Sequence, residues 1–477
     1  MVNRSSAYEK SLKWCAVSLA DVILRGKRLE ASVFDVEAKH ALDIVNNGKY
    51  KTMPLYGDGG IVDKAHYGSR LKRNYVTDDH EKAIGFIGSS EMLDIYPRPV
   101  KFMIDEERVQ DLHIKENTVL LSRSGTIGNV AFVNKTLSRF LVSEHAIRLE
   151  CEKYAGYVYA FLKTNIGKKI VCSNIYGAVI QQIEPEHLSA VPIPDATNDI
   201  KERIHNLVVR SYELRDESND LIEEATKLMV EELKLPSIKD FDMQCHKKDA
   251  SVNTFSIKLS HMGGRADASY HIPIVNSIIK VIGENSLEVT TIGDNRISED
   301  VVLPGRFKRV YVESDYGVKF LGGKEMNQLN PSSEKYLSKK AHAKQLEGSL
   351  GIKPNSILTP ARGSLGEVVM PCEHFLDWAI SDNMMQILSN EEMCGYLFVF
   401  LNSDYGKALI QRFTYGGVVD AIEPDHIKQV QVPLLKNKDT QKQINDMALK
   451  VNEKRYEAYL LEQEALRIMN EEVIYAR

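Results

Sequence analysis

The two halves of the sequence repeat the same ordered motifs, and this repetition constrains the fold more than any other feature. The motif KENTVL at Lys115–Leu120 returns as KPNSIL at Lys353–Leu358, 238 residues later. The segment YGAVIQQIEPEHL at Tyr176–Leu188 returns as YGGVVDAIEPDHI at Tyr415–Ile427, 239 residues later. Further blocks match in the same order, at offsets between 236 and 240. Because a solenoid needs three or more short repeats, the sequence predicts two copies of one domain with internal pseudo-twofold symmetry.

Each copy combines short strand-like runs with short aromatic helices, which predicts a mixed α/β (α+β) fold. The stretch LLSRSGTIGNVAFV at Leu120–Val133 has two glycines between apolar runs and predicts a strand–turn–strand. The related stretch at Ile357–Pro371 predicts the same structure in the second copy. A phosphate-binding loop is disfavoured, because no helix N-terminus follows the glycines.

A long helix is predicted at the end of each copy, at Asp199–Leu235 and Asp439–Arg477. Apolar residues recur in both with the spacing of four and three that is typical of coiled coils. An ordinary amphipathic helix packed on its own domain is the alternative, which a rod of about 54 Å disfavours. The predicted seam positions are Ile204, Leu207, Leu214, Leu221, Leu228, Ile444, Met447, Val451, Leu461 and Ile468.

These patterns divide the 477 residues into five segments. A linker is placed at 236–256, where no hydrophobic periodicity is found. The predicted segments are a globular domain at 1–197, a spacer helix at 198–235, the linker at 236–256, a second globular domain at 257–437 and a second spacer helix at 438–477.

The net charge of −5, taken alone, argues against a nucleic-acid-binding protein. The acidic residues are, however, concentrated in the predicted helices. Asp199–Lys234 holds ten acidic and six basic residues, and Asp439–Arg477 holds eight and six. Their net charges of −4 and −2, subtracted from −5, leave +1 for the rest of the chain. The globular parts can therefore present a basic face.

Other features exclude several classes of protein. No apolar run approaches the roughly 18 residues of a membrane span, and we recognise no signal peptide. The six cysteines stand far apart, so we expect a cytoplasmic protein with reduced thiols. No GxxxxGK[ST], HExxH, CxxC or GxSxG motif occurs. We therefore expect no catalytic residue, metal or cofactor in this chain.

The ordered motifs resemble those of the specificity subunit of type I restriction–modification systems. The motifs are Arg28–Ser32 and Arg265–Ser269, the glycine turns, and the two YG segments that run into long helices. The resemblance covers nearly the whole chain. It implies two target-recognition domains that read the halves of a gapped DNA sequence, and two helices that pair antiparallel as a spacer.

The resemblance also implies partners. Two methyltransferase subunits would bind the spacer and carry the S-adenosylmethionine and the adenine-methylating site. Whether nuclease or translocase subunits join, or whether the chain serves a related phage-defence methyltransferase, is left open by the sequence. The specificity subunit itself would catalyse nothing and would contact no membrane.

Candidate DNA contacts are basic residues beside aromatic ones at matching positions in the two copies. Solvated strand edges and ordinary surface arginines are the alternative interpretation. The candidates are Arg70, Lys72, Arg73 and Tyr75, Arg306, Lys308, Arg309 and Tyr311, Arg123, Ser124 and Arg362 in the glycine turns, and Lys339 and Lys340 in a basic run of the second copy.

A different function is also compatible with the sequence. The overall acidity favours a duplicated, non-catalytic scaffold that bridges two protein partners through its helices. Salt-dependent duplex binding distinguishes this alternative from a DNA-specificity subunit.

Overall fold

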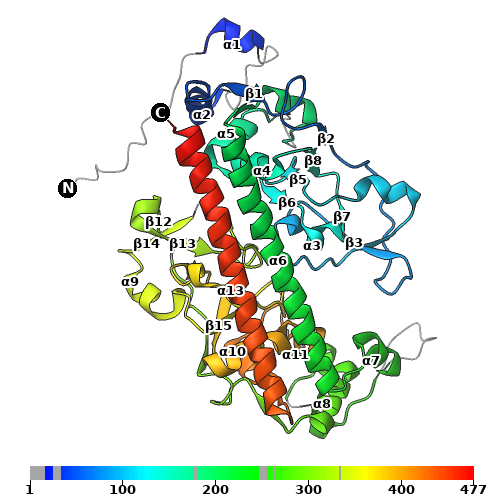
Figure 1. The fold of residues 1–477 in the computed structure, drawn as a ribbon. Coiled ribbons are helices and arrows are strands. Elements are labelled where there is room, and N and C mark those ends of the chain that lie inside the picture. Colours follow the sequence, from blue (N-terminus) through cyan, green and yellow to red (C-terminus); the bar gives the residue numbers. More distant parts are fainter. Residues whose placement is uncertain are drawn as a thin grey trace. The chain divides into compact units, whose positions relative to one another are not determined.

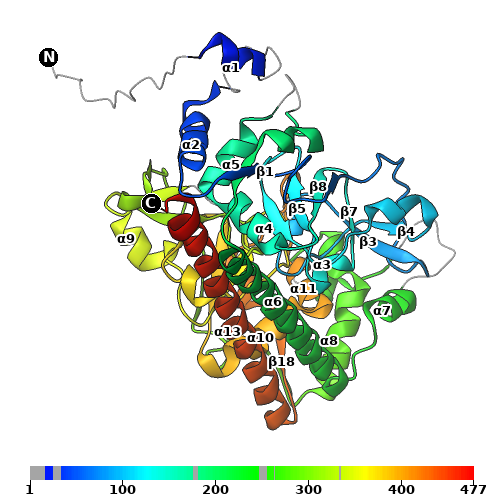
Figure 2. The ribbon, with the colours of Figure 1, turned by 45° about the horizontal axis from the view of Figure 1, so that its top comes forward.

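The computed structural model describes residues 17–24, 34–175, 181–245, 255–262, 264–331 and 335–476. Two compact units make up the chain. Unit 1 contains 1–213 and 460–477, and unit 2 contains 214–459. The motif at Arg28–Ser32 and part of the first YG segment lie outside the described residues. Figures 1 and 2 show the elements of both units.

Unit 1 is a mixed α/β unit with short strands. Its α-helices and strands are α1 (Leu19–Leu24), α2 (Val36–Asn46), β1 (Thr52–Pro54), β2 (Lys64–His66), β3 (Ala83–Ile87), β4 (Phe102–Ile104), β5 (Val119–Ser122), β6 (Val130–Phe132), α3 (Lys135–Ser138), β7 (Leu141–Val142), β8 (Ala146–Glu150), α4 (Ala155–Lys163), α5 (Asn165–Cys172), β9 (Pro192–Pro194), the first part of α6 (Asn198–Glu232) and the end of α13 (Lys438–Ile468).

Unit 2 is built from the same kinds of element. It contains the rest of α6, α7 (Ile238–Cys245), α8 (Pro273–Asn285), β10 (Glu288–Thr291), β11 (Asp300–Val302), β12 (Tyr311–Val312), β13 (Gly317–Leu321), β14 (Tyr336–Ser338), α9 (Ala343–Gln345), β15 (Ser356–Pro360), β16 (Ala379–Ile380), β17 (Met384–Leu388), α10 (Glu391–Asn402), α11 (Asp404–Gln411), α12 (Pro424–Lys428), β18 (Gln431–Leu434) and most of α13 (Lys438–Ile468).

The sheets of the two units have related strand orders. Unit 1 has sheets β2-β8-β5-β6, β4-β3-β7 and β1-β9, and unit 2 has sheets β11-β17-β15, β12-β14-β13-β16 and β10-β18. Each unit has one parallel pair, β3 with β7 and β13 with β16, in the part of the chain that is described. The mixed α/β class expected from the sequence is confirmed.

The glycine-containing stretch of unit 1 is a strand–turn–strand, as predicted. β5 pairs antiparallel with β6, and Gly125 and Gly128 have φ values of 75° and 84°. In unit 2, Gly363 and Gly366 have φ values of 89° and 90°. There Val369 forms only an isolated bridge with Leu358, so the returning strand is shorter than predicted. Glycine is required at these turns because left-handed backbone is costly for other residues.

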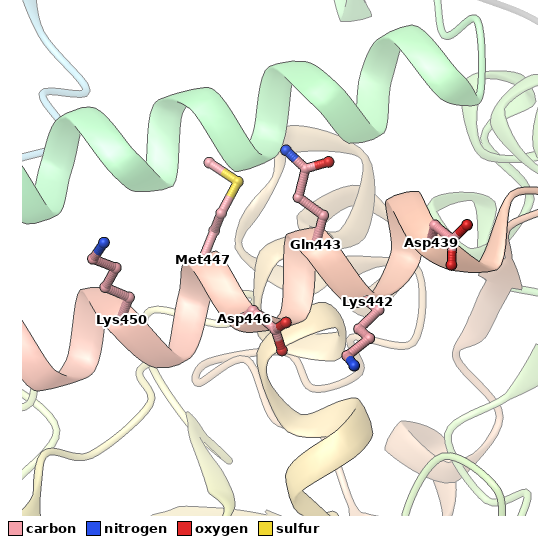
Figure 3. A pocket seen from close by; sticks show the side chains of 6 residues that line it. All are labelled: Asp439, Lys442, Gln443, Asp446, Met447 and Lys450. Carbon is pink, nitrogen blue, oxygen red and sulfur yellow. The ribbon is translucent and has the colours of Figure 1, made fainter.

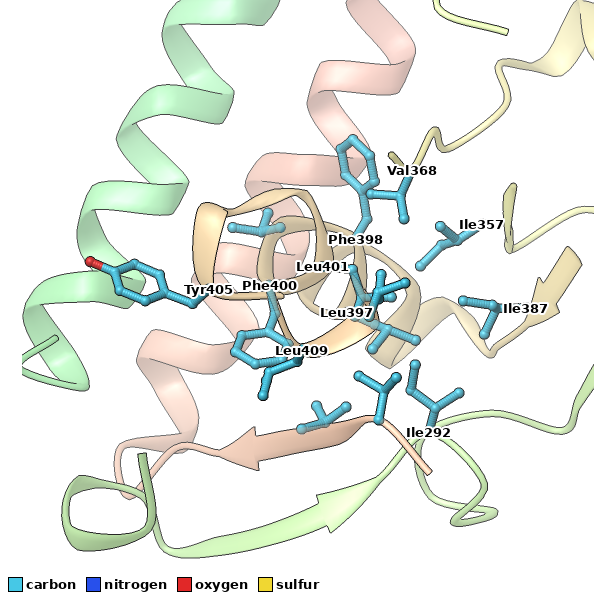
Figure 4. Close-up of a cluster of buried hydrophobic side chains, with 14 of the residues drawn as sticks. Ile292, Ile357, Val368, Ile387, Leu397, Phe398, Phe400, Leu401, Tyr405 and Leu409 are labelled. Carbon is cyan, nitrogen blue, oxygen red and sulfur yellow. The ribbon is translucent and has the colours of Figure 1, made fainter. Parts of the chain in front are cut away.

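The aromatic helices form the centre of each core. In unit 2, α10 is buried on all sides from Met393 to Leu401, and Leu397, Phe400 and Leu401 are 0% exposed. Figure 4 shows Leu397 and Leu401 on the side of Ile357 and Ile387 from strands β15 and β17, and Phe400 beside Leu409. Burial of each large apolar side chain contributes roughly 1.5–3 kcal/mol, so this helix is a main source of the stability of the unit.

The segment predicted as a linker contains a helix. Ile238–Cys245 forms α7, and Phe241 on it is 1% exposed and belongs to the core of unit 2. Its ring lies 6.4 Å from that of Tyr405. Residues 246–254 lie outside the described part of the chain.

Helix α6 buries a stripe spaced by three and four residues. The predicted positions Leu207, Leu221 and Leu228 are half-buried and pack against the hydrophobic cores. Ser211 and Ser218, which interrupt the apolar spacing in the sequence, are nevertheless 0% exposed and belong to the buried stripe. The buried stripe is Ile204, Val208, Ser211, Arg215, Ser218, Ile222, Ala225 and Met229, and the predicted Leu214 is buried beside it.

Helix α13 buries a similar stripe and continues as the π-helix η10 (Met469–Ile474). Of its predicted positions, Ile444, Val451 and Ile468 are buried, whereas Met447 and Leu461 are half-buried. The stripe is Ile444, Ala448, Val451, Arg455, Ala458, Glu462, Ala465 and Met469.

Segments of α6 and α13 contact each other within each unit (Figures 1 and 2). In unit 1, Arg203 donates to Glu472, with Nη1 and Oε2 3.1 Å apart. In unit 2, the Nε of buried Arg455 donates to the Ser218 hydroxyl at 3.2 Å, and its Nη2 donates to the Asn219 side chain at 3.3 Å. The contacts along these stripes are therefore partly polar.

Replacement of Gly167 or Gly406 by alanine is predicted to destabilise the fold. A Cβ on Gly167 would lie 2.1 Å from the Phe161 carbonyl oxygen, and one on Gly406 would lie 2.2 Å from that of Phe400. Overpacking of this kind costs about 1–3 kcal/mol, which should lower the urea midpoint of the full-length protein. Gly305→Ala is the control, because a Cβ there meets nothing within 4 Å. Equal midpoints for G167A, G406A and G305A would contradict the packing described here.

Candidate nucleic-acid interface

The basic cluster of unit 1 precedes strand β3. Arg70 and Lys72 are exposed. Arg73 is half-buried, and its Nη2 donates to both Glu144 oxygens, at 2.9 and 2.8 Å. Its guanidinium also lies 5.0 Å from the centre of the Phe86 ring. Arg73 therefore fastens the segment to the unit, while Arg70 and Lys72 are presented to solvent.

The basic cluster of unit 2 is fastened in the same way. Arg309 donates to the Asp382 carboxylate, and its guanidinium lies 5.1 Å from the centre of the Phe320 ring. Arg306 and Lys308 are exposed. The sequence pattern groups the three cations of each cluster as DNA contacts, but in the structure one arginine of each cluster, Arg73 or Arg309, pairs with a carboxylate.

The anchoring pair perturbs the titration of Glu144. Burial raises the pKa of this carboxyl group. Hydrogen bonds from a backbone N–H and from Arg73, together with the Arg73 charge, outweigh burial and hold the pKa below its ordinary value. The Asp382 carboxylate similarly raises the pKa of Arg309 by hydrogen bonding. Glu144 and Arg309 are therefore charged at neutral pH.

An aromatic side chain stands beside each cluster. Tyr75 is 43% exposed and Tyr311 is 45% exposed. The Tyr75 ring lies 6.2 Å from that of Phe86, and the Tyr311 ring lies 6.2 Å from that of Phe320. Each cluster thus combines cations with a half-exposed ring, a combination suited to nucleic acid.

Strand pairing adds a lysine to the unit 1 cluster that the sequence pattern does not reveal. Val76 forms an isolated bridge with Phe102, which brings Lys101 beside Tyr75. The Lys101 Nζ lies 5.4 Å from the centre of the Tyr75 ring. Only a prediction of the register between these segments could have identified it.

Strand pairing also joins the two basic segments of unit 2. β12 pairs with β14, and the Ser338 N–H donates to the Val310 carbonyl at 2.9 Å. Lys339 and Lys340 follow directly after Ser338, and both are exposed. Lys308 and these two lysines therefore come from segments about 30 residues apart in sequence that lie together at the end of one sheet.

The candidates in the glycine turns lie in different surroundings. Arg123 is 1% exposed, pairs with Glu184, and places its guanidinium 4.0 Å from the centre of the Tyr67 ring. Ser124 is 8% exposed, and its hydroxyl lies 2.6 Å from Nδ1 of His145. Only Arg362 is exposed. We therefore leave Arg123 and Ser124 out of the candidate interface, because their side chains have internal partners.

A depression of about 380 Å³ lies on α13 in unit 2. Figure 3 shows Gln443 and Met447 pointing toward α6. One helix supplies the whole lining, so the depression is poorly shaped to enclose a small molecule. Its lining residues are Asp439, Lys442, Gln443, Asp446, Met447 and Lys450.

Comparison with known proteins gives matches only among solved structures. No family model and no curated protein matches the chain. The S subunit of a type I restriction–modification system from M. genitalium is 14% identical, with a TM-score of 0.34 over 89% of this chain and 95% of the other. The HsdS subunit from Thermoanaerobacter tengcongensis is 12% identical, with a TM-score of 0.26 over 89% and 96%.

A third structure, titled as the complex assembly and conformational transition of the type I R-M system, is 12% identical. Its TM-score is 0.26 over 88% of this chain and 97% of the other. The chain resembles type I specificity subunits. This is the family whose motifs the sequence resembles.

Membrane-spanning helices and metal-binding groups are absent from the described residues. No helix among the described residues is long and apolar enough to cross a membrane. Within the same residues, no group of three or more His, Cys, Asp or Glu side chains is arranged to hold a metal ion.

The Arg73–Glu144 pair predicts a pH-dependent contribution to stability. Because the folded-state pKa of Glu144 is lowered, its contribution is present above the ordinary glutamate pKa of about 4.3 and is lost as pH falls through the folded value. Glu144→Gln should therefore reduce stability at pH 7, by about 1–3 kcal/mol. The difference from the wild type should shrink below about pH 4.

Urea unfolding at several pH values measures this effect. The exposed Glu116 provides a matched control as Glu116→Gln. A deficit of E144Q that stays constant between pH 3 and pH 7 would show that the pair does not supply the pH dependence.

Proposed function

We propose that the chain is the DNA-recognition subunit of a type I restriction–modification complex and that it binds a bipartite, gapped duplex target. The observation that carries this proposal is the pair of exposed cation clusters, one in each unit. In both units an arginine fixed to a carboxylate and a phenylalanine holds neighbouring cations at the surface. Cations fixed in this way suit the contacts to phosphates that orient a protein on DNA.

The proposal includes a tandem duplication, which matched contacts support. The Tyr157 hydroxyl donates to the Pro194 carbonyl at 2.7 Å, and the Tyr396 hydroxyl donates to that of Pro433 at 2.7 Å. The tyrosines and the prolines are both 239 residues apart. The Glu184 N–H also donates to a histidine three residues later, as the Glu423 N–H does. Two diverged copies of one domain would preserve such contacts.

We further propose that α6 and α13 form an antiparallel coiled coil that spaces the two recognition domains. Arg203, near the start of α6, meets Glu472, near the end of the chain. Ser218, in the middle of α6, meets Arg455, in the middle of α13. This is the order of contacts that an antiparallel pair requires. The buried stripes on both helices have the spacing of four and three residues that knobs-into-holes packing uses.

The exposed faces of the helices suit protein partners. Asp220, Glu223, Glu224 and Glu231 are exposed along the second half of α6. Such a face repels phosphates but is available to a protein with complementary charge. We assign it to methyltransferase subunits, which would hold the S-adenosylmethionine and carry out the methylation. The chain itself would contribute recognition and spacing, and no chemical step.

Removal of cations from the unit 2 cluster should weaken the salt dependence of duplex binding. Lys308→Ala, Lys339→Ala and Lys340→Ala together should reduce the slope of log K against log salt concentration by about 1 for each phosphate that the variant no longer neutralises. Lys280→Ala is a matched control, because this exposed lysine on α8 pairs with Glu284. Fluorescence anisotropy of the purified complex measures the slopes. An unchanged slope in the triple variant would leave the cluster without a role in DNA binding.

The complex should also methylate its own target sequence in host DNA. Co-expression with the methyltransferase gene from the same locus should yield a co-purifying complex and a methyladenine map with two specific half-sites separated by a gap of unspecified bases. A map with an ungapped motif, or salt-independent duplex binding, would instead favour the protein scaffold.

A further inference from the structure

An exposed four-residue turn follows each basic cluster. Thr77–His80 follows the cluster of unit 1, and Glu313–Tyr316 follows that of unit 2, 236 residues later. All eight residues are exposed. The same backbone hydrogen bond closes both turns, from the His80 N–H to the Thr77 carbonyl at 3.2 Å and from the Tyr316 N–H to the Glu313 carbonyl at 3.1 Å.

The turn of unit 2 is held rigidly. The Lys339 N–H donates to the Tyr316 carbonyl at 3.2 Å, which ties the turn to the end of β14. At the adjacent Gly317 a Cβ would lie 2.4 Å from the Cβ of Tyr336, so this glycine permits close packing of the turn on β14. The Tyr316 side chain is nevertheless 72% exposed. A large aromatic side chain thus projects from a fixed backbone.

The charges of this turn differ from those on either side. Glu313 and Asp315 are acidic and exposed, and Lys308, Lys339 and Lys340 adjoin them through the pairing of β12 with β14. Carboxylates repel DNA phosphates. On base edges, however, a carboxylate accepts a hydrogen bond from the amino group of cytosine, and a tyrosine hydroxyl can donate or accept. Acidic groups between cations are therefore better suited to contact base edges in a DNA groove than to contact the DNA phosphates.

We propose that the turn Glu313–Tyr316 enters a groove of duplex DNA and reads bases of one half-site, with Asp315 and Tyr316 as specificity-determining residues. Thr77–His80 reads the other half-site in the same way. Asp79 and Asp315 occupy matching positions, whereas His80 stands where the second turn has Tyr316. The half-sites therefore differ in sequence. This inference rests on the proposed function and assigns base reading within it.

The test uses the intact complex with its methyltransferase subunits. In the double variant Asp315→Ala, Tyr316→Ala, the methyladenine map should show weaker discrimination at one or two base pairs of one half-site. Discrimination there should fall by about 5- to 150-fold for each base that the variant no longer reads, and the other half-site should be unchanged. The salt slope of duplex binding should stay at the wild-type value, because these side chains contact no phosphate.

Two matched variants sharpen the test. The double variant Lys339→Ala, Lys340→Ala should have the opposite effect to D315A/Y316A. Its salt slope of duplex binding should be reduced, and its methylated motif should be unchanged. His80→Ala should relax only the opposite half-site. If the D315A/Y316A complex does not methylate, competition between duplexes with single base-pair substitutions in each half-site gives the same discrimination ratios.

The outcomes distinguish this inference from the function on which it rests. A wild-type complex with a gapped motif and a D315A/Y316A complex with the same discrimination at every position would overturn base reading by the turn. The proposed function would then stand. A wild-type complex with no gapped motif and no salt-dependent binding would overturn both.

Discussion

Polar groups in the buried stripes of α6 and α13 are the constraint on which the rest of the structure depends. Buried Arg455 donates to Ser218 and Asn219 in unit 2. In unit 1 the Tyr159 hydroxyl donates to the fully buried Glu462 at 2.6 Å. A shift of either helix along its axis would leave these groups buried without partners, at several kcal/mol for a charge. Such groups therefore favour a single register. The core of unit 1 also contains Ala465 and Met469, so that core is incomplete until these residues have been made.

The sequence predicts well the features that depend on local pattern. The strand–turn–strand at Leu120–Val133, the aromatic helices and both long helices are present. It predicts poorly what depends on distant partners. From the sequence, Ser218 is interpreted as a polar interruption of the apolar spacing. Its partner Arg455 is 237 residues away, so the local pattern cannot show their hydrogen bond. From the sequence, Arg123 is interpreted as a surface cation, because the local sequence pattern cannot show that Glu184 pairs with it. The basic clusters are visible in the composition, but Lys101 is not, because strand register brings it to Tyr75.

The proposed function follows from a division of charge along the chain. The long helices carry all of the net negative charge, and the globular parts hold cations at fixed positions by means of Arg73 and Arg309. Each anchoring arginine pairs its own charge with a carboxylate, and its neighbours remain exposed. DNA would be attracted to the clusters and repelled by the helices. Under the proposed function, one chain would bind duplex at two places and its helices would bind protein partners.

The central claim is that α6 and α13 set the distance between the two recognition domains. Lengthening both helices by the same amount tests this claim most directly. One heptad inserted into α6 and one opposite it in α13 would keep the register of the buried stripe and lengthen the pair by about 10 Å. The methyladenine map of the complex should then show unchanged half-sites and a gap longer by about three base pairs, at roughly 3.4 Å each. A stable, active complex whose gap keeps its original length would contradict the account.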